Sequence, residues 1–213
     1  LEAMDRQSTD RIQPDEEEMN RRLLAAARFM RFSANFSLNT TRKVLEVAGG
    51  MNGFQTVDAS TAADIGGNKA SFFFFMVYQI EADEALVLEF DLPPARYWGL
   101  SLGNVWFGGL DYSYHQSSLN AHQAVLDRDG KFRAVIAMTD PGVPNWIDPV
   151  DTPLGIVLMR VYHGQGTPAG TAKKVPLARA REHMPPDTAT VTPEQRHAIL
   201  ERRKRASLRR YGF

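Results

Sequence analysis

From Ser71 onward, the chain is a series of short segments rich in aromatic and β-branched residues, separated by turn residues. Such segments are typical of strands. Between these segments the sequence shows no helix long enough for the crossover that neighbouring parallel strands need. The sequence therefore predicts a mainly β fold, an antiparallel β-sandwich of the jelly-roll kind rather than a parallel α/β sheet. The expected strands cover residues 72–80, 85–90, 97–105, 121–126, 132–138 and 156–163.

One turn in this series carries a specific signal. Asp127 and Gly130 stand at the two ends of a four-residue polar corner, Asp-Arg-Asp-Gly. Asp and Gly at such a corner favour a hairpin, because Asp bonds to nearby backbone and Gly accepts a positive φ. We expect the segments 121–126 and 132–138 to pair across it.

Helices are expected at both ends of the chain. Asp15 is a plausible N-cap with Glu18 three residues later, and apolar residues then recur at helical spacing to about Ser37. Near the C-terminus, Thr192, Pro193 and Gln195 match a capping box with proline at the first helical position, which predicts a helix to about Arg210. Both helices are expected to pack on a protein surface, either the rest of the domain or a second subunit in a homo-oligomer.

The expected organisation is one globular domain in three parts. Residues 1–40 form an arm and an amphipathic helix, residues 41–165 form the β core, and residues 166–213 form a loop and a basic helix. A length of 213 residues is enough for one substantial core with helical arms.

Composition and motifs exclude several classes of function. Lys+Arg and Asp+Glu both number 25, so net charge favours neither nucleic acid nor a membrane surface. The absence of cysteine excludes disulfides, thiolate metal sites and a cysteine nucleophile. Histidine spacing matches no common metal motif, and no glycine-rich phosphate loop is present, so we expect neither a metal nor a cofactor. No apolar run reaches the length of a membrane span. We expect a cytoplasmic location, although a chain that starts at Leu1 leaves a leader or an upstream domain open.

Three stretches carry unusual words in a fixed order: YWGLSLGNVWFGGLDY, HQSSLNAHQAVLDRDGKFRAVIA and DPGVPNWID. They resemble a bacterial family, the domain of unknown function numbered twelve-fourteen. The resemblance covers roughly Phe72 to Tyr162, and the closing RRYG at 209–212 also fits. It implies a β-sandwich with flanking helices, and it brings no catalytic residue.

A polar corner between residues 111 and 122 contains the residue types of acid–base and nucleophilic chemistry. His115 or His122 could serve as a general base, Asp111 could orient it, and neighbouring serines could act as nucleophiles. No nucleophile-elbow motif accompanies them. The alternative interpretation is that these side chains bond to the backbone of their own loop.

The loop 140–148 is the second candidate region. Trp146 could stack on a sugar ring, or it could fill the end of the core. We expect the hairpin of residues 121–126 and 132–138 to bring His122 and Trp146 to one end of the sandwich, beside a pocket. The residues predicted to bind a ligand there are Asn120, His122, Asp140, Asn145, Trp146 and Asp148.

Three functions remain open at this point. The favoured one is binding of a small polar or carbohydrate-like molecule at one end of the sandwich. The alternatives are a hydrolase or lyase with a histidine general base, and a structural or assembly module.

Overall fold

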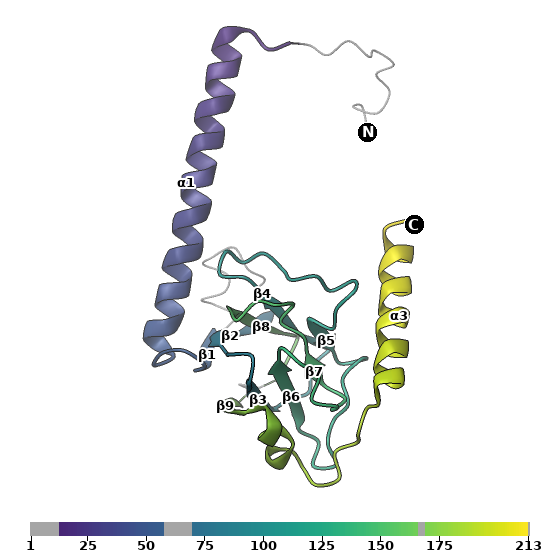
Figure 1. Cartoon of the computed structure of the whole chain (residues 1–213). Helices are drawn as coiled ribbons and strands as arrows, with labels where there is room; N and C mark the ends of the chain where they lie inside the picture. The colour runs from purple at the N-terminus through teal and green to yellow at the C-terminus, as the bar shows by residue number, and fades with distance from the viewer. Residues whose placement is uncertain (1–12, 58–69, 166–168, 213) are drawn as a thin grey trace. The chain divides into compact units, whose positions relative to one another are not determined.

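The computed structural model describes residues 13–57, 70–165 and 169–212. The chain divides into two compact units, Leu1–Ser37 and Leu38–Phe213. The elements, shown in Figure 1, are α1 (Glu16–Val47), β1 (Gln55–Val57), β2 (Ser71–Gln79), β3 (Glu84–Asp91), β4 (Tyr97–Gly103), β5 (Ser118–Asn120), β6 (Phe132–Ala137), β7 (Trp146–Ile147), β8 (Leu154–Tyr162), β9 (Ala169–Pro176), the 3-10 helix η2 (Leu177–His183) and α3 (Pro193–Arg210).

The strands form two sheets. One has the order β1-β2-β8-β4-β5 and the other the order β7-β6-β3-β9. Every pairing is antiparallel except the short one between β6 and β7, which is parallel. The predicted architecture of mainly antiparallel strands with a helix at each end is confirmed.

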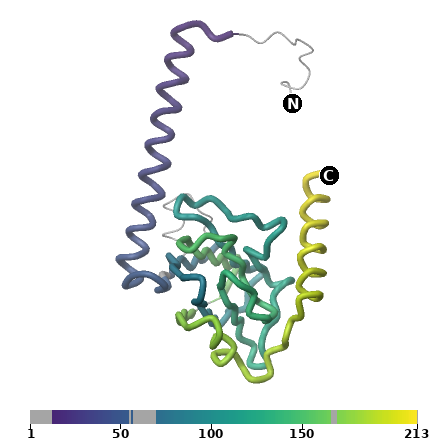
Figure 2. Tube along the Cα trace, in the orientation of Figure 1, coloured from purple at the N-terminus to yellow at the C-terminus, as the bar shows by residue number. Residues whose placement is uncertain are grey.

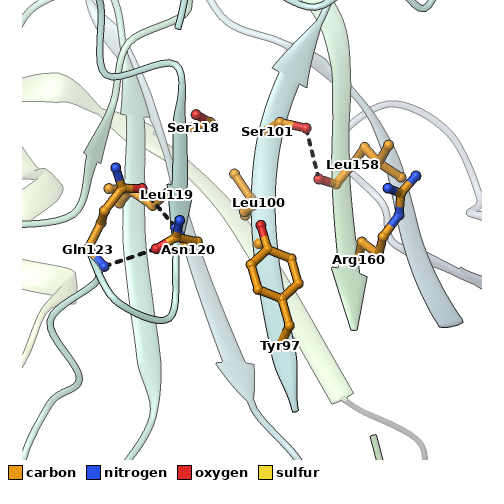
Figure 3. A pocket seen from close by; sticks show the side chains of 10 residues that line it. Tyr97, Leu100, Ser101, Ser118, Leu119, Asn120, Gln123, Leu158 and Arg160 are labelled. Carbon is orange, nitrogen blue, oxygen red and sulfur yellow. Dashed lines mark hydrogen bonds between the residues drawn. The ribbon is translucent and has the colours of Figure 1, made fainter. Parts of the chain in front are cut away.

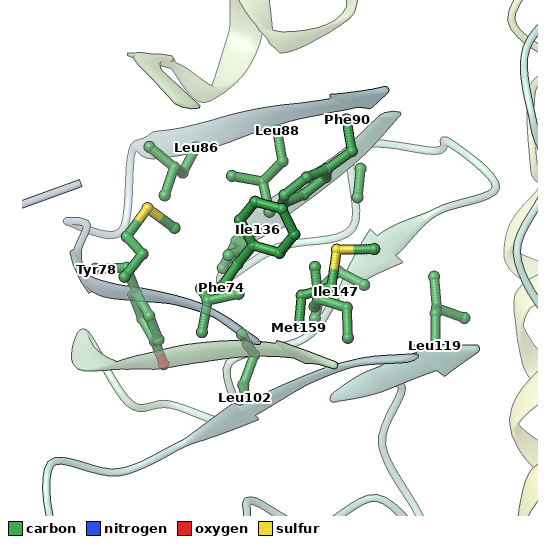
Figure 4. Close-up of a cluster of buried hydrophobic side chains, with 14 of the residues drawn as sticks. Phe74, Tyr78, Leu86, Leu88, Phe90, Leu102, Leu119, Ile136, Ile147 and Met159 are labelled. Carbon is green, nitrogen blue, oxygen red and sulfur yellow. The ribbon is translucent and has the colours of Figure 1, made fainter. Parts of the chain in front are cut away.

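One hydrophobic core draws on both sheets. In the five-stranded sheet, Phe74, Tyr78 and Met159 are fully buried, and in the four-stranded sheet Leu86 and Phe90 are. Figure 4 shows these side chains between the ribbons of the two sheets. In β4 alternate residues are buried, so Trp98, Leu100 and Leu102 enter the core while the residues between them face away from it. This alternation positions the candidate site described below.

The expected hairpin between residues 121–126 and 132–138 is wrong. The turn itself is present, because the Gly130 N–H donates to the Asp127 carbonyl at 2.9 Å and Gly130 has a φ of 80°. The strand before it ends at Asn120, however, and belongs to the five-stranded sheet, whereas β6 belongs to the other. Side-chain bonds decide this: Asn120 Oδ1 accepts the N–H groups of His122 and Gln123, which turns the chain where a strand was expected.

Strand β9 lies in the part of residues 166–213 that was expected to be a loop. It pairs along its whole length with β3 as an edge strand of the four-stranded sheet. Its composition hides it from pattern analysis, because edge strands carry lysines and small residues instead of an apolar alternation. Lys174 is an example, since its Nζ donates to Glu84 Oε2 at 2.9 Å.

The N-terminal helix is longer than expected, ending at Val47 instead of about Ser37. Its last turns pack on the sheet, where Val44 joins Val77 and Ile156 in a small buried cluster. Within the first unit, α1 exposes large apolar side chains: Leu23 is 60% exposed and Met30 is 70% exposed.

The C-terminal helix begins as predicted. Thr192 Oγ1 accepts the N–H of Gln195, and Gln195 Oε1 accepts the N–H of Thr192, which completes the capping box. The traces in Figures 1 and 2 show α3 on the side of the molecule where β5 and β7 lie. Its contacts with the domain are formed mainly by arginine side chains, which the next section describes.

Candidate functional site

A cleft of about 240 Å³ lies on the face of the five-stranded sheet that points away from the core. The pairing register builds it. Gly99 of β4 pairs with Asn120 of β5 on one side and with Arg160 of β8 on the other. In the next row of the same face, Ser101 stands between Ser118 and Leu158. Figure 3 shows these side chains projecting from the three strands.

Gly99 forms the floor of the cleft because it has no side chain. A Cβ at this position would lie 2.7 Å from the Tyr97 hydroxyl oxygen and 3.3 Å from its ring. The Tyr97 side chain therefore leans over the glycine, and it remains half exposed. Any larger residue at position 99 would fill the hollow and displace this ring. The close approach of the Tyr97 side chain thus explains why a glycine occupies position 99.

Hydroxyl, amide and guanidinium groups surround this floor. The backbone N–H of Asn120 donates to Gln123 Oε1 at 3.2 Å, and Gln123 N–H donates back to Asn120 Oδ1 at 3.1 Å. The amide nitrogens of both side chains are left as donors. Arg160 of β8 also lines the cleft, and its guanidinium lies 5.0 Å from the centre of the Phe73 ring on the neighbouring strand β2. The cleft therefore combines one aromatic face with several polar groups, as small-molecule sites commonly do.

Helix α3 reaches the edge of this cleft through Arg203. Its guanidinium donates to the carbonyl of Tyr112 at 2.7 Å, to the carbonyl of Ser118 at 2.6 Å and to the hydroxyl of Ser118 at 2.5 Å. Desolvation lowers the pKa of Arg203, because the group is partly withdrawn from water. The segment 111–118 is thereby tied to α3.

A second arginine of α3, Arg196, is 5% exposed. Its Nε donates to Asp140 Oδ2 at 2.8 Å, and its guanidinium also bonds to the Val143 carbonyl and lies over the Trp146 ring. The prediction that α3 packs on a protein surface is confirmed. Arg196 and Arg203 supply much of this packing.

Asn145 and Trp146, predicted to bind a ligand, are buried and bonded within the chain. Asn145 accepts the N–H of Val125 at 2.9 Å and donates to the carbonyls of Val125 and Arg133. Trp146 Nε1 donates to the Ala137 carbonyl at 2.8 Å and the residue is 7% exposed. Their contacts favour the interpretation of Trp146 as part of the core.

In the polar corner between residues 111 and 122, some of the candidate side chains also stabilise their own loop. Asp111 Oδ1 accepts the N–H groups of Ser113 and Tyr114, which is loop stabilisation, and its side chain does not contact either candidate histidine. His122 is exposed in the turn after β5 and does not line the cleft. His115 instead pairs with Asp148, which had been assigned to ligand binding: the distance from His115 Nδ1 to Asp148 Oδ2 is 2.7 Å.

Asp148 is held firmly in place. Its second oxygen accepts the N–H of Val150 at 2.8 Å, and its own N–H donates to the Gln116 carbonyl. Val150 has a φ of 50°, which is unusual for a β-branched residue. His115 stays 41% exposed while Asp148 is 14% exposed. The pair has the arrangement in which a carboxylate orients an accessible imidazole.

Of the residues around the cleft, the sequence analysis named Asn120 as ligand-binding, and it missed Tyr97, Ser101 and Arg160. The alternation in β4, with polar or small residues at every second position, was the available signal for the first two. Arg160 stands alone as a charge inside the apolar run of β8, which also marks it. Neither signal shows that the three strands are neighbours.

Among the described residues, no three His, Cys, Asp or Glu side chains gather as a metal site would require. No helix in ranges 13–57, 70–165 and 169–212 combines the length and hydropathy needed to cross a bilayer.

Comparison with known proteins gives two structural neighbours of interest, both uncharacterised. An uncharacterised protein of Burkholderia cenocepacia matches with a TM-score of 0.58 and 28% identity, over 60% of this chain and 36% of its own. The protein VPA0106 of Vibrio parahaemolyticus matches with a TM-score of 0.38 and 13% identity, over 47% of this chain and 30% of its own. No family model matches the chain, and no curated protein matches it. The chain therefore spans about a third of the length of the solved structures it resembles.

Proposed function

We propose that this chain binds a small polar organic molecule, carbohydrate-like in size and polarity, in the cleft floored by Gly99. The observation that carries the proposal is the row Arg160–Gly99–Asn120, in which a missing side chain leaves a hollow between two polar ones. Ligand pockets usually measure roughly 300–1,000 Å³, so this smaller cleft suits a molecule no larger than a monosaccharide.

We also infer that the two sheets form a sandwich and that the chain belongs to the family it resembles. The core shared by the two sheets supports the first inference, and the three sequence motifs support the second.

Filling the cleft tests this function. In Gly99→Val the added side chain occupies the hollow and pushes Tyr97 aside. Gly109→Val is the matched control, because a Cβ at Gly109 meets nothing within 4 Å. A panel of monosaccharides and polyols is titrated into isotopically labelled protein, and amide chemical shifts are followed. We expect shifts at residues 97–101, 118–123 and 158–160 that Gly99→Val abolishes and Gly109→Val retains. Shifts that map elsewhere, or that survive Gly99→Val, would refute the proposal.

A second candidate is acid–base chemistry at His115, of the hydrolase or lyase type, and the 2.7 Å contact with Asp148 favours it. With the carboxylate accepting from Nδ1–H, the lone pair of Nε2 can take a proton from a substrate. His115→Gln should abolish turnover of any ester or lyase substrate that the protein accepts, and His122→Gln should leave the rate unchanged. Equal rates in both variants would exclude His115 as the base.

The third candidate is an assembly role through α1. Its support is the row of exposed apolar side chains that includes Leu23, Phe29 and Met30. Exposed apolar patches of this kind mark contact surfaces. The double variant Leu23→Glu/Met30→Glu should lower the mass in solution measured by light scattering, whereas Asn35→Glu should not. A wild-type protein that is already monomeric would count against assembly.

A further inference from the structure

Arg160 lines the cleft, and Arg203 contacts the lining residue Ser118. Neither arginine has a carboxylate within ion-pair distance in the part of the chain that the structure describes. Arg160 stacks on Phe73, and Arg203 donates only to neutral oxygens. Hydrogen bonds to neutral oxygens satisfy the N–H groups of Arg203 but leave its charge uncompensated. The cleft is therefore a region of excess positive charge in a chain whose formal net charge is zero.

The two buried arginines of the described residues, Arg133 and Arg196, have opposite charges beside them, unlike the exposed Arg160 and the half-buried Arg203. Arg133 contacts three carboxylates, and Arg196 pairs with Asp140. Withdrawing a guanidinium from water is costly unless an opposite charge accompanies it. At Arg203 this opposite charge is absent among the described residues, and its partner Ser118 lines the cleft. An anion entering the hollow would supply it.

Ser118 transmits the effect of Arg203 into the cleft. The hydroxyl oxygen of Ser118 accepts a hydrogen bond from the Arg203 guanidinium, so its own O–H group is directed away from that partner. A hydroxyl whose oxygen accepts from a cation is a stronger donor, since hydrogen bonds polarise one another. Ser118 lines the cleft from β5, and Arg160 lines it from β8 across β4, with its guanidinium over the Phe73 ring of β2.

We propose that the ligand of this cleft carries a carboxylate, as a uronic acid or another small polyhydroxy acid does. This inference rests on the proposed function and names its substrate class. The Arg160 guanidinium offers the paired N–H groups that match a carboxylate, and the Ser118 hydroxyl adds a donor backed by Arg203. Tyr97, Asn120 and Gln123 then face the hydroxyl-bearing part of the molecule.

Matched probes test the charge separately from the shape. D-glucuronate and D-glucose differ only in that a carboxylate replaces the C6 hydroxymethyl group, and glucose 6-phosphate carries a phosphate there. Each is titrated at constant ionic strength while amide shifts of the cleft residues are followed. A charge-assisted contact predicts a Kd for glucuronate at least about tenfold below that of glucose. The pair galacturonate and galactose repeats the comparison with another stereochemistry.

Variants identify the source of the preference. Arg160→Gln should weaken binding of the uronates more than that of the neutral sugars, which reduces the ratio of dissociation constants toward one. Arg205→Gln is the control, because this substitution removes the same charge from an exposed position on α3. A preference that Arg205→Gln also removes would show a general charge effect and overturn the assignment.

The other outcomes separate this inference from the proposed function. Equal affinity for the acids and the neutral sugars, with shifts in the cleft, would refute the carboxylate while the binding function stands. A preference for the sugar phosphate over both uronates would replace the carboxylate with phosphate and so overturn the inference. Absence of cleft shifts with every probe would refute both proposals.

Discussion

The guanidinium groups of Arg133 and Arg203 differ in their partners, although both belong to one domain. Arg133 of β6 is 9% exposed and contacts Glu89 at 2.6 Å, Asp127 at 2.8 Å and Asp129 at 2.8 Å. Arg203 of α3 is half-buried and contacts only carbonyl and hydroxyl oxygens. Contact with carboxylates raises the pKa of Arg133, while desolvation lowers the pKa of Arg203. The first arginine has its partners within the fold, and the second still lacks a negative charge.

The location of each arginine explains this difference. Arg133 links strand β3 to the turn at 127–130, which connects the two sheets, so its ion pairs join parts of the scaffold. Arg203 contacts Ser118, which lines a cleft open to solvent. Binding sites usually stand on rigid scaffolds in this way. The comparison therefore assigns Arg133 to stability, and the proposed function assigns Arg203 to recognition; three predictions can break or sharpen this contrast.

The largest effect is expected for Arg133→Met. Removing the cation leaves three carboxylates close together without their shared partner, which should lower the free energy of unfolding by roughly 3–5 kcal/mol. Chemical denaturation followed by tryptophan fluorescence measures this. Arg128→Met is the control: Arg128 pairs with Asp187 on the surface with a side chain 89% exposed, so its loss should cost less than about 1 kcal/mol. Similar losses of unfolding free energy in the two variants would contradict a stabilising role for Arg133.

A smaller effect concerns the pH dependence of stability. The hydrogen bond from Arg133, with further support from the Lys131 N–H, lowers the pKa of Asp129 from 3.8 to about 2. A group with a depressed folded pKa stabilises the fold above its unfolded pKa, and this contribution is lost as the pH falls through the folded value. The wild-type protein should therefore lose stability between about pH 4 and pH 2. In Arg133→Met this decline should be shallower, which melting temperatures measured across that range would reveal; parallel curves for the two proteins would contradict it.

The smallest effect on stability is expected for Arg203→Met. The variant loses hydrogen bonds to Tyr112 and Ser118 but also removes a charge that was costly to desolvate, so the net change should stay below about 1 kcal/mol. The same variant should reduce the preference for glucuronate over glucose, because Ser118 loses its cationic partner. A large loss of stability with an unchanged preference would place Arg203 in the same class as Arg133.

Local chemistry predicted much of the scaffold. The aromatic and branched runs at β2, β3, β4, β6 and β8, the turn at Asp127–Gly130 and the capping box at Thr192 all follow from neighbouring residues in the chain. Where two local signals competed, pattern reasoning failed. The side chain of Asn120 bends the chain at a point where the following residues suggested a strand. At β9, pairing with β3 makes a strand from residues whose own preference for one is weak.

The amino-acid sequence by itself determined most of the extended segments, the turn at Asp127–Gly130 and the start of the last helix, because each depends on contacts between residues a few positions apart. Only the tertiary structure decided that β4 lies between β5 and β8, and hence that Gly99 separates Asn120 from Arg160. It also decided that Arg203 meets Ser118 instead of a carboxylate. Strand order and register are set by the packing of the whole core, and no local pattern encodes which distant residues that packing will bring together.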